Sequence, residues 1–176
     1  MTQTGNTTDF ARQLQKLWSI ESQLVEAMPR MIQKAVNLGL RKNLALHFEE
    51  TRQHKVAVEA ICKQLEIDPT AGEHDGGLEA LLYEGEQSLV NLAGGGLDAA
   101  ILANSQKVEE FEIAAYVPAA EAALALGYKG VSKRLYLSLE EERQAETKLK
   151  FLEKSLFAKT ADIGELTQSP EAMKTY

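Results

Sequence analysis

Two stretches of the sequence carry carboxylates and histidines at helical spacing. In HFEETRQHKV, His47, Glu50 and His54 recur at intervals of three and four residues, and in QKVEEFEIAAY, Glu109 and Glu112 are three residues apart. Residues three or four positions apart lie on one face of an α-helix. Carboxylates and imidazoles gathered on such faces are ligands that iron, manganese and zinc accept from proteins. The spacing therefore indicates a carboxylate-rich metal site built on helices.

The helices that would carry these residues can be recognised from the surrounding sequence. Helix-forming residues dominate, strand-like alternation is nearly absent, and glycine and proline are concentrated in a few short stretches. The predicted fold class is all-α, with a helical bundle at residues 1–158, a C-terminal tail at 159–176, and Asp9 as the first N-cap. Long helices and one shorter helix (78–92) are expected at about residues 9–36, 40–66, 78–92, 97–126 and 131–157.

The lengths of the connections select one topology among helical bundles. Short turns near residues 37–39 and 127–130 make the flanking helices antiparallel neighbours, and the roughly 30 residues between the second and third long helices can span the bundle. This pattern predicts a ferritin-like four-helix bundle with one long crossover that contains a short extra helix. Pro29 and Pro118 fall at similar places in the two halves, where each either kinks a continuous helix or starts a shorter one.

Polar residues interrupt the apolar stripe of each long helix at one level. Core positions at alternating spacings of three and four include Glu21, His54, Glu112 and Glu142, one from each long helix. Glu112 and Glu142 are equally distant in sequence from the turn at Gly127, and Glu21 and His54 are equally distant from the earlier turn. Helices that meet at a turn bring such pairs to the same height, so these side chains are expected to converge on one layer.

A layer of buried carboxylates is unfavourable unless cations compensate, because each carboxylate loses hydration and repels the others. A pair of metal ions would remove this penalty. The alternative for any one glutamate is a place at the edge of the bundle, paired with lysine or arginine. His47 is interpreted as a packing residue, His74 as solvated, and Tyr116 as either a donor to the site or a packing residue. A solvent-facing charged edge is expected to hold Glu49, Glu110, Glu140 and Glu141.

The composition narrows the range of partners. The net charge is −7, with lysine and arginine scattered among acidic residues, which disfavours nucleic acid. No apolar run approaches the roughly 18 residues of a membrane span, and the first residues do not resemble a secretion signal. The single Cys62 has no partner for an internal disulfide, and its helical spacing beside Ile61 and Leu65 predicts that it packs in the core. These features favour a cytoplasmic protein without a membrane partner.

Four stretches together resemble the bacterial YciE/YciF-type ferritin-like proteins. They are ESQLVEAMPRM, HFEETRQHKV, DAAILANSQKVEEFEIAAY and LEEERQAETKL, and the resemblance covers roughly residues 14–157. It implies a ferritin-like fold and a dinuclear metal site, with no settled substrate. The sequence departs from the general ferritin-like pattern in the longer Glu50-x-x-x-His54 spacing and in the lack of histidine on the last helix. The resemblance points to the metal ligands Glu21, Glu50, His54, Glu109, Glu112, Glu142 and Glu146.

Two functions are compatible with these features. The first is a carboxylate-bridged protein that binds two metal ions, with iron favoured and manganese or zinc as alternatives, and that handles iron, oxygen or peroxide under stress. The second is a structural or interaction bundle, assembled as a homodimer, whose metal site stabilises the fold or is vestigial. The missing histidine on the last helix favours the second function. Whether the protein has catalytic turnover is left open by the sequence.

Overall fold

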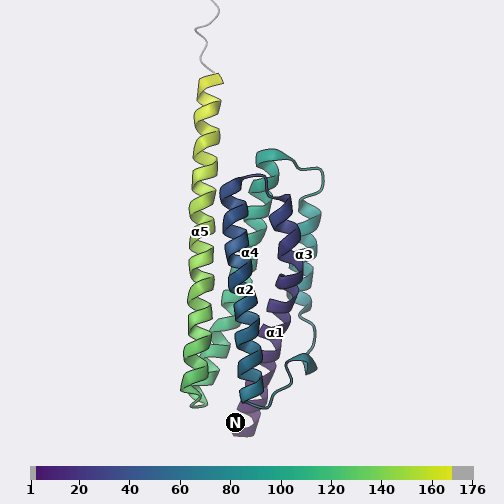
Figure 1. Cartoon of the computed structure of the whole chain (residues 1–176), viewed down its shortest axis with the longest axis vertical. Coiled ribbons are helices and arrows are strands. Elements are labelled where there is room, and N and C mark those ends of the chain that lie inside the picture. Colours follow the sequence, from purple (N-terminus) through teal and green to yellow (C-terminus); the bar gives the residue numbers. More distant parts are fainter. Residues whose placement is uncertain (1–2, 168–176) are drawn as a thin grey trace, which may run out of the picture.

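The computed structural model describes residues 3–167, with side chains described for residues 6–156. Within this range the chain is helical and contains no strand (Figure 1). Four long helices account for most of it, and a short helix and a 3-10 turn lie in the long connection between the second and third of them. The elements are α1 (Gln3–Lys34), α2 (Leu38–Gln64), η1 (Pro69–Ala71), α3 (Gly76–Ser88), α4 (Gly94–Ala125) and α5 (Lys129–Thr167).

The four long helices form a bundle with the topology expected from the sequence. Helix α1 packs against α2 and α4, and α5 packs against α4 and α2. The start of α1 meets the end of α4, and the start of α2 meets the end of α5, so neighbouring helices run antiparallel. The connection through η1 and α3 spans the bundle, and α3 lies against α1 and α4 (Figure 1). The chain is therefore an all-α, ferritin-like four-helix bundle with one long crossover.

Two predicted helix ends are wrong. Asp9 does not cap α1, because the helix begins at Gln3 and Asp9 lies inside it, paired with Arg12. Helix α5 does not end near Phe157 but continues to Thr167. The absence of an apolar stripe does not by itself stop a helix, and residues 158–167 contain no proline, the next one being at position 170. Residues 168–176 lie outside the described residues, and the division into a domain and a tail at residue 158 stays a prediction.

The turns fix the register between the helices. Asn37 caps α2 by accepting a hydrogen bond from the Leu40 amide at 3.0 Å. Asp98 of α4 accepts hydrogen bonds from the amides of Val36 and Asn37 at 2.8 and 2.9 Å, which ties this turn to the third long helix. After α4, Gly127 has a φ of +83°, a conformation that glycine adopts without strain.

The two mid-helix prolines do not start new helices. Pro29 lies inside α1 and Pro118 lies inside α4, and both helices are continuous through them. The alternative of shorter helices that begin at the prolines is therefore wrong.

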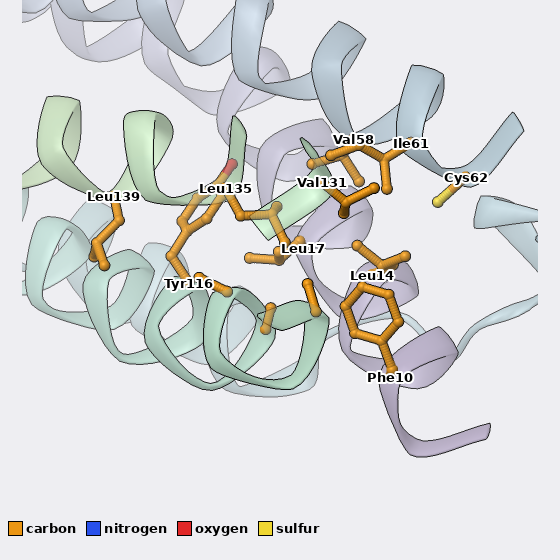
Figure 2. Packing of buried hydrophobic residues seen from close by; sticks show 13 residues of the cluster. Phe10, Leu14, Leu17, Val58, Ile61, Cys62, Tyr116, Val131, Leu135 and Leu139 are labelled. Carbon is orange, nitrogen blue, oxygen red and sulfur yellow. The ribbon is translucent and has the colours of Figure 1, made fainter. Parts of the chain in front are cut away.

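Apolar clusters occupy both ends of the bundle interior. At one end, Tyr116 is itself a member of the apolar cluster, and its hydroxyl is the one oxygen among the side chains drawn (Figure 2). Cys62 is fully buried there, which confirms its expected place in the core. This cluster includes Phe10, Leu14, Leu17, Val58, Ile61, Cys62, Val131 and Leu135. The cluster at the other end includes Ala35, Leu40, Leu44, Ile101 and Leu149. The polar layer lies between the two ends.

Candidate metal centre

Two adjacent groups of buried histidine and glutamate side chains lie in this layer. Within each group, one nitrogen or oxygen atom per residue lies within 4.8 Å of the others. All four long helices contribute, and Glu142 of α5 belongs to both groups. The first group contains His47, Glu109, Glu112 and Glu142, and the second contains Glu21, His54 and Glu142. We call these six residues the His/Glu cluster.

The spacing on α2 sets the extent of the cluster along the bundle. His47 and His54 are seven residues apart, which is two helical turns or about 10 Å of rise. Thr51 lies between them on the buried face, and its hydroxyl donates a hydrogen bond to the His47 carbonyl at 3.0 Å. The Thr51 hydroxyl is thus bonded within its own helix. The carboxylates near the two imidazoles come from the other helices.

Glu142 lies between the two imidazoles. Its Oε1 is 2.6 Å from Nδ1 of His54, and its Oε2 is 3.6 Å from Nε2 of His47. Nε2 of His47 is also 3.1 Å from Oε1 of Glu109, and Nδ1 of His54 is 3.9 Å from Oε1 of Glu21. The short contact between His54 and Glu142 is an ion pair when the imidazole is protonated. One carboxylate is thus positioned to serve both groups.

Each buried histidine also contacts a carboxylate that is partly exposed. Nδ1 of His47 is 3.3 Å from Oε2 of Glu50, and Nε2 of His54 is 2.6 Å from Oε2 of Glu141. The Glu50 and Glu141 side chains are 32% and 45% exposed. A neutral imidazole that donates its N–H to such a carboxylate presents the lone pair of its other nitrogen to the cluster. Glu50 and Glu141 therefore hold the two imidazoles in the orientation that a metal ligand requires.

Tyr116 adds a similar restraint to Glu21. The tyrosine is fully buried, and its hydroxyl donates a hydrogen bond to Oε1 of Glu21. Its ring lies edge-on to the His54 ring, with the ring centroids 6.0 Å apart. Both roles considered for Tyr116 are present in the structure, because its ring packs in the apolar cluster and its hydroxyl donates to Glu21.

The structure brings together five of the seven residues expected as ligands, namely Glu21, His54, Glu109, Glu112 and Glu142. Glu50 lies beside the cluster, against His47 and 3.8 Å from Lys148. Glu146 lies away from it and binds Lys150 at 2.6 Å.

Two residues that the sequence assigned elsewhere also take part. His47, interpreted as a packing residue, is a member of the cluster, and Glu141, assigned to the solvent-facing edge, contacts His54. The seven-residue spacing from His54 was the available signal for His47. No comparable signal marked Glu141.

The cluster retains protons in the absence of a cation. Burial raises the pKa of Glu21 to about 8, against the opposing effect of His54, and raises the pKa of Glu109 to about 7. Burial also raises the pKa of Glu112 well above its ordinary value, and neighbouring Glu142 and Glu21 add to the shift. For His54, burial alone would lower the pKa, but the surrounding carboxylates of Glu142, Glu21 and Glu141 together outweigh burial and raise it to about 9. Protonation of these side chains therefore reduces the repulsion between the buried carboxylates, as a bound cation would also do.

Several oxygens of the cluster have no hydrogen-bond partner among the described residues. They are Oε2 of Glu21, Oε2 of Glu109 and both oxygens of Glu112 and of Glu142. Buried polar atoms are rarely left in this state, because each loses its hydration without a replacement. Unpartnered carboxylate oxygens beside two imidazole nitrogens form a donor set that fits hard or borderline divalent cations such as iron, manganese and zinc.

Comparison with known proteins places the chain in a family. Residues 7–162 match the family described as "Domain of unknown function (DUF892)". The chain belongs to the DUF892 family. Protein YciF of Escherichia coli (strain K12) is 29% identical to it over 141 residues, which are 80% of this chain and 85% of YciF. The YciE/YciF-type resemblance is therefore confirmed.

Two solved structures resemble this DUF892 protein along most of their length. YcfI from Rhodopseudomonas palustris, described as a "putative structural protein", has a TM-score of 0.78 at 32% identity, covering 85% of this chain and 94% of YcfI. The crystal structure of the E. coli stress protein YciF has a TM-score of 0.78 at 27% identity, covering 88% of this chain and 98% of YciF. Within the residues described for the DUF892 protein, no helix is long and apolar enough to cross a membrane.

The contact between Glu141 and His54 predicts a loss of metal affinity when it is removed. We expect Glu141→Ala to weaken metal binding by about 10- to 100-fold, the usual effect of losing a carboxylate that orients a histidine ligand. Glu140→Ala is the matched control, because Glu140 is exposed and bonds only Gln144 among the described residues. Competitive titration against a chelator measures both affinities. Equal affinities for the two variants would contradict the orienting role.

The raised pKa values predict that the metal-free DUF892 protein loses stability as the pH rises. The folded state holds protons on Glu21 up to a pKa of about 8 and on His54 up to about 9, whereas ordinary values are 4.5 and 6.5. Between these limits the folded state binds more protons, so the free energy of unfolding falls with pH. The slope is about 1.4 kcal/mol per pH unit for each extra proton. Urea titrations between about pH 5 and pH 9, with a chelator present, measure the free energy of unfolding at each pH. A free energy of unfolding that rises over this range would contradict the prediction.

Proposed function

We propose that this DUF892 protein binds two metal ions in the His/Glu cluster, with iron as the metal and oxygen or peroxide as the reactant. The observation that carries the proposal is the shared position of Glu142, whose two oxygens approach different imidazoles. A carboxylate between two adjacent donor groups is the arrangement that bridges a metal pair in ferritin-like bundles. The unpartnered oxygens of the cluster support the same conclusion.

Each group would hold one ion. His47, Glu109 and Glu112 would bind the first, Glu21 and His54 would bind the second, and Glu142 would bridge them. Oxygen ligands with one imidazole per ion suit iron and manganese, and zinc is compatible with the same donors. The notable feature of this chain is that both imidazoles come from α2.

A bound iron pair would supply electrons for the reduction of oxygen or peroxide. The protein's own groups would orient the ligands and limit access of water. Glu50 and Glu141 hold the imidazoles, Tyr116 holds Glu21, and the apolar ends of the bundle keep the layer dry. The Tyr116 hydroxyl keeps its proton, because burial raises the pKa of this side chain well above 10. It therefore remains a hydrogen-bond donor at neutral pH.

Metal analysis tests this function directly. Protein purified without added metal, and the same protein after anaerobic addition of ferrous iron, are analysed for elements. We expect about two irons per chain, as the two donor groups imply. Mixing the ferrous protein with peroxide should then give the near-ultraviolet absorption of oxo-bridged ferric iron. A folded protein that binds neither iron, manganese nor zinc would contradict metal binding, and full loading without reaction would contradict the redox part.

A structural role is the second candidate. The histidines and glutamates of the metal-free cluster already compensate one another, as the contacts of 2.6 and 3.1 Å show. In that case the metal would only stabilise the fold. Chelation would then lower the melting temperature, and added peroxide would not be consumed. Peroxide consumption that depends on bound metal would exclude this candidate as the whole function.

We also propose that the protein acts as a cytoplasmic homodimer in the response to stress. Large apolar side chains are exposed on the outer sides of α2 and α5, including Leu38, Leu46, Val56 and Phe151. A second copy would cover such residues. The stress role follows the description of E. coli YciF, and the buried free Cys62 suits a reducing compartment. Light scattering of the purified protein measures the assembly, and a monomer at micromolar concentration would contradict it.

A further inference from the structure

Two hollows approach each other beside the His/Glu cluster. The larger is a groove of about 320 Å³ between α1, α3 and α4. The smaller is a void of about 10 Å³ whose wall includes His47, Glu109 and Glu112 of the cluster. A void of this size holds about one water molecule. The void thus lies against the first donor group, and the groove lies nearer the surface.

Met31 of α1 and Val108 of α4 line both hollows. Val108 is buried and stiff at its β-branched carbon, whereas Met31 is only partly buried and has an unbranched, flexible side chain. The two side chains therefore form the partition between the groove and the void. Because Met31 is the more flexible of the two, rotation of its side chain is the movement expected to join the two spaces.

The wall of the void limits what could pass. Apart from the cluster residues, it is formed by Leu24, Met28, Leu44 and the two partition residues, with Ser105 as its one polar member. A hydrated cation would have to shed its water against this apolar wall, which is costly. A small uncharged molecule would not. The partly exposed carboxylates Glu50 and Glu141 lie at the histidines instead, on the α2 and α5 side of the cluster.

We propose that the groove under α3 is the entry route for a small uncharged oxidant, molecular oxygen or hydrogen peroxide, and that Met31 gates it. The proposal rests on the proposed function for its oxidant, but the route itself is a property of the metal-free protein. The size of the side chain at position 31 should control how fast such molecules reach the void. Larger substrates would be excluded, because the void has room for only about one water-sized molecule.

Dissolved oxygen provides a test that needs no metal. Oxygen is paramagnetic and speeds the relaxation of the nuclei that it approaches, and Met28 lines the void but not the groove. With ¹³C-methyl methionine in the metal-free protein, we expect oxygen to enhance relaxation of the Met28 methyl group. Met31→Ala should raise this enhancement at least about twofold, and Met31→Phe should lower it. Leu82→Ala is the control, because Leu82 lines only the groove, and it should have no effect.

The outcomes separate the route from the proposed function. An unchanged Met28 signal in both Met31 variants, or no enhancement in the wild-type protein, overturns the route even if iron binds. The expected order of the variants establishes the route even if iron does not bind. Where iron binds, anaerobic ferrous protein mixed with oxygen should be oxidised faster in Met31→Ala and slower in Met31→Phe, at equal metal content. Equal oxidation rates in the two variants would also overturn the gate.

Discussion

Glu142→Gln should abolish the binding of a metal pair. The substitution keeps the shape of the side chain but removes the charge that both donor groups share. We expect at most one ion per chain, bound at least about 100-fold more weakly, since the loss of even an orienting partner costs about 10- to 100-fold. Titration with ferrous or manganous ion under anaerobic conditions, followed by elemental analysis, measures both number and affinity.

Glu146→Gln is the matched control for this experiment. Glu146 lies one helical turn further along α5 and was an expected ligand, but it pairs with Lys150 outside the cluster. We expect it to bind two ions with the affinity of the natural protein. Loss of binding in Glu146→Gln, with Glu142→Gln unaffected, would contradict the site described above.

Glu112→Met should make the metal-free protein more stable. Glu112 is fully buried, neither of its oxygens has a hydrogen-bond partner among the described residues, and burial raises its pKa well above 4.5. Methionine has a similar volume without the polar oxygens. Replacing buried charged groups by well-packed apolar ones stabilises proteins by about 1–4 kcal/mol, and we expect a gain in that range. Chemical denaturation with a chelator present measures it.

The same variant should lose metal affinity, so stability and binding should change in opposite directions. Glu110→Met is the control, because Glu110 is exposed two residues away on the same helix. It should change the free energy of unfolding by no more than about 0.5 kcal/mol. A Glu112→Met protein that is less stable without metal would mean that the carboxylate is satisfied in the folded state. The burial of Glu112 would then need another explanation than metal binding.

The level of the site could be predicted from the sequence, but the complete ligand set could not. Equal distances from two turns placed Glu112 with Glu142 and Glu21 with His54, and these side chains meet. At about 100° per residue, His47 lies within about 20° of His54 around α2, whereas Glu50 is about 60° from His47. His47 and Glu50 are therefore both compatible with a core stripe whose residues alternate at spacings of three and four. The rotation of α2 against its neighbours decides between them, and that depends on packing across the whole bundle.

The role of Glu141 was not predictable for a different reason. The residue is adjacent to Glu142 and therefore points to another side of α5, where a sequence pattern indicates only solvent. It reaches His54 because α2 and α5 are close neighbours at this level. The extent of α5 was missed for a local reason, since the apolar stripe ends before the helix does. The hydrophobic pattern of a single segment does not show which side chains of another helix it will contact. It also does not show whether a helix continues beyond the part that packs against its neighbours.

Helix α3 is the most weakly anchored helix of the fold, and this has a consequence for its motion. Of its 13 residues, only Leu78 is buried. Near its C-terminal end, the Asn104 side chain of α4 donates a hydrogen bond to the Gly85 carbonyl at 3.0 Å. A helix with so few buried contacts opens locally at a small fraction of the free energy of global unfolding. Its backbone amides should exchange with solvent hydrogen long before those of the four bundle helices. Local opening of α3 would therefore uncover the groove without unfolding the four bundle helices that carry the donor groups.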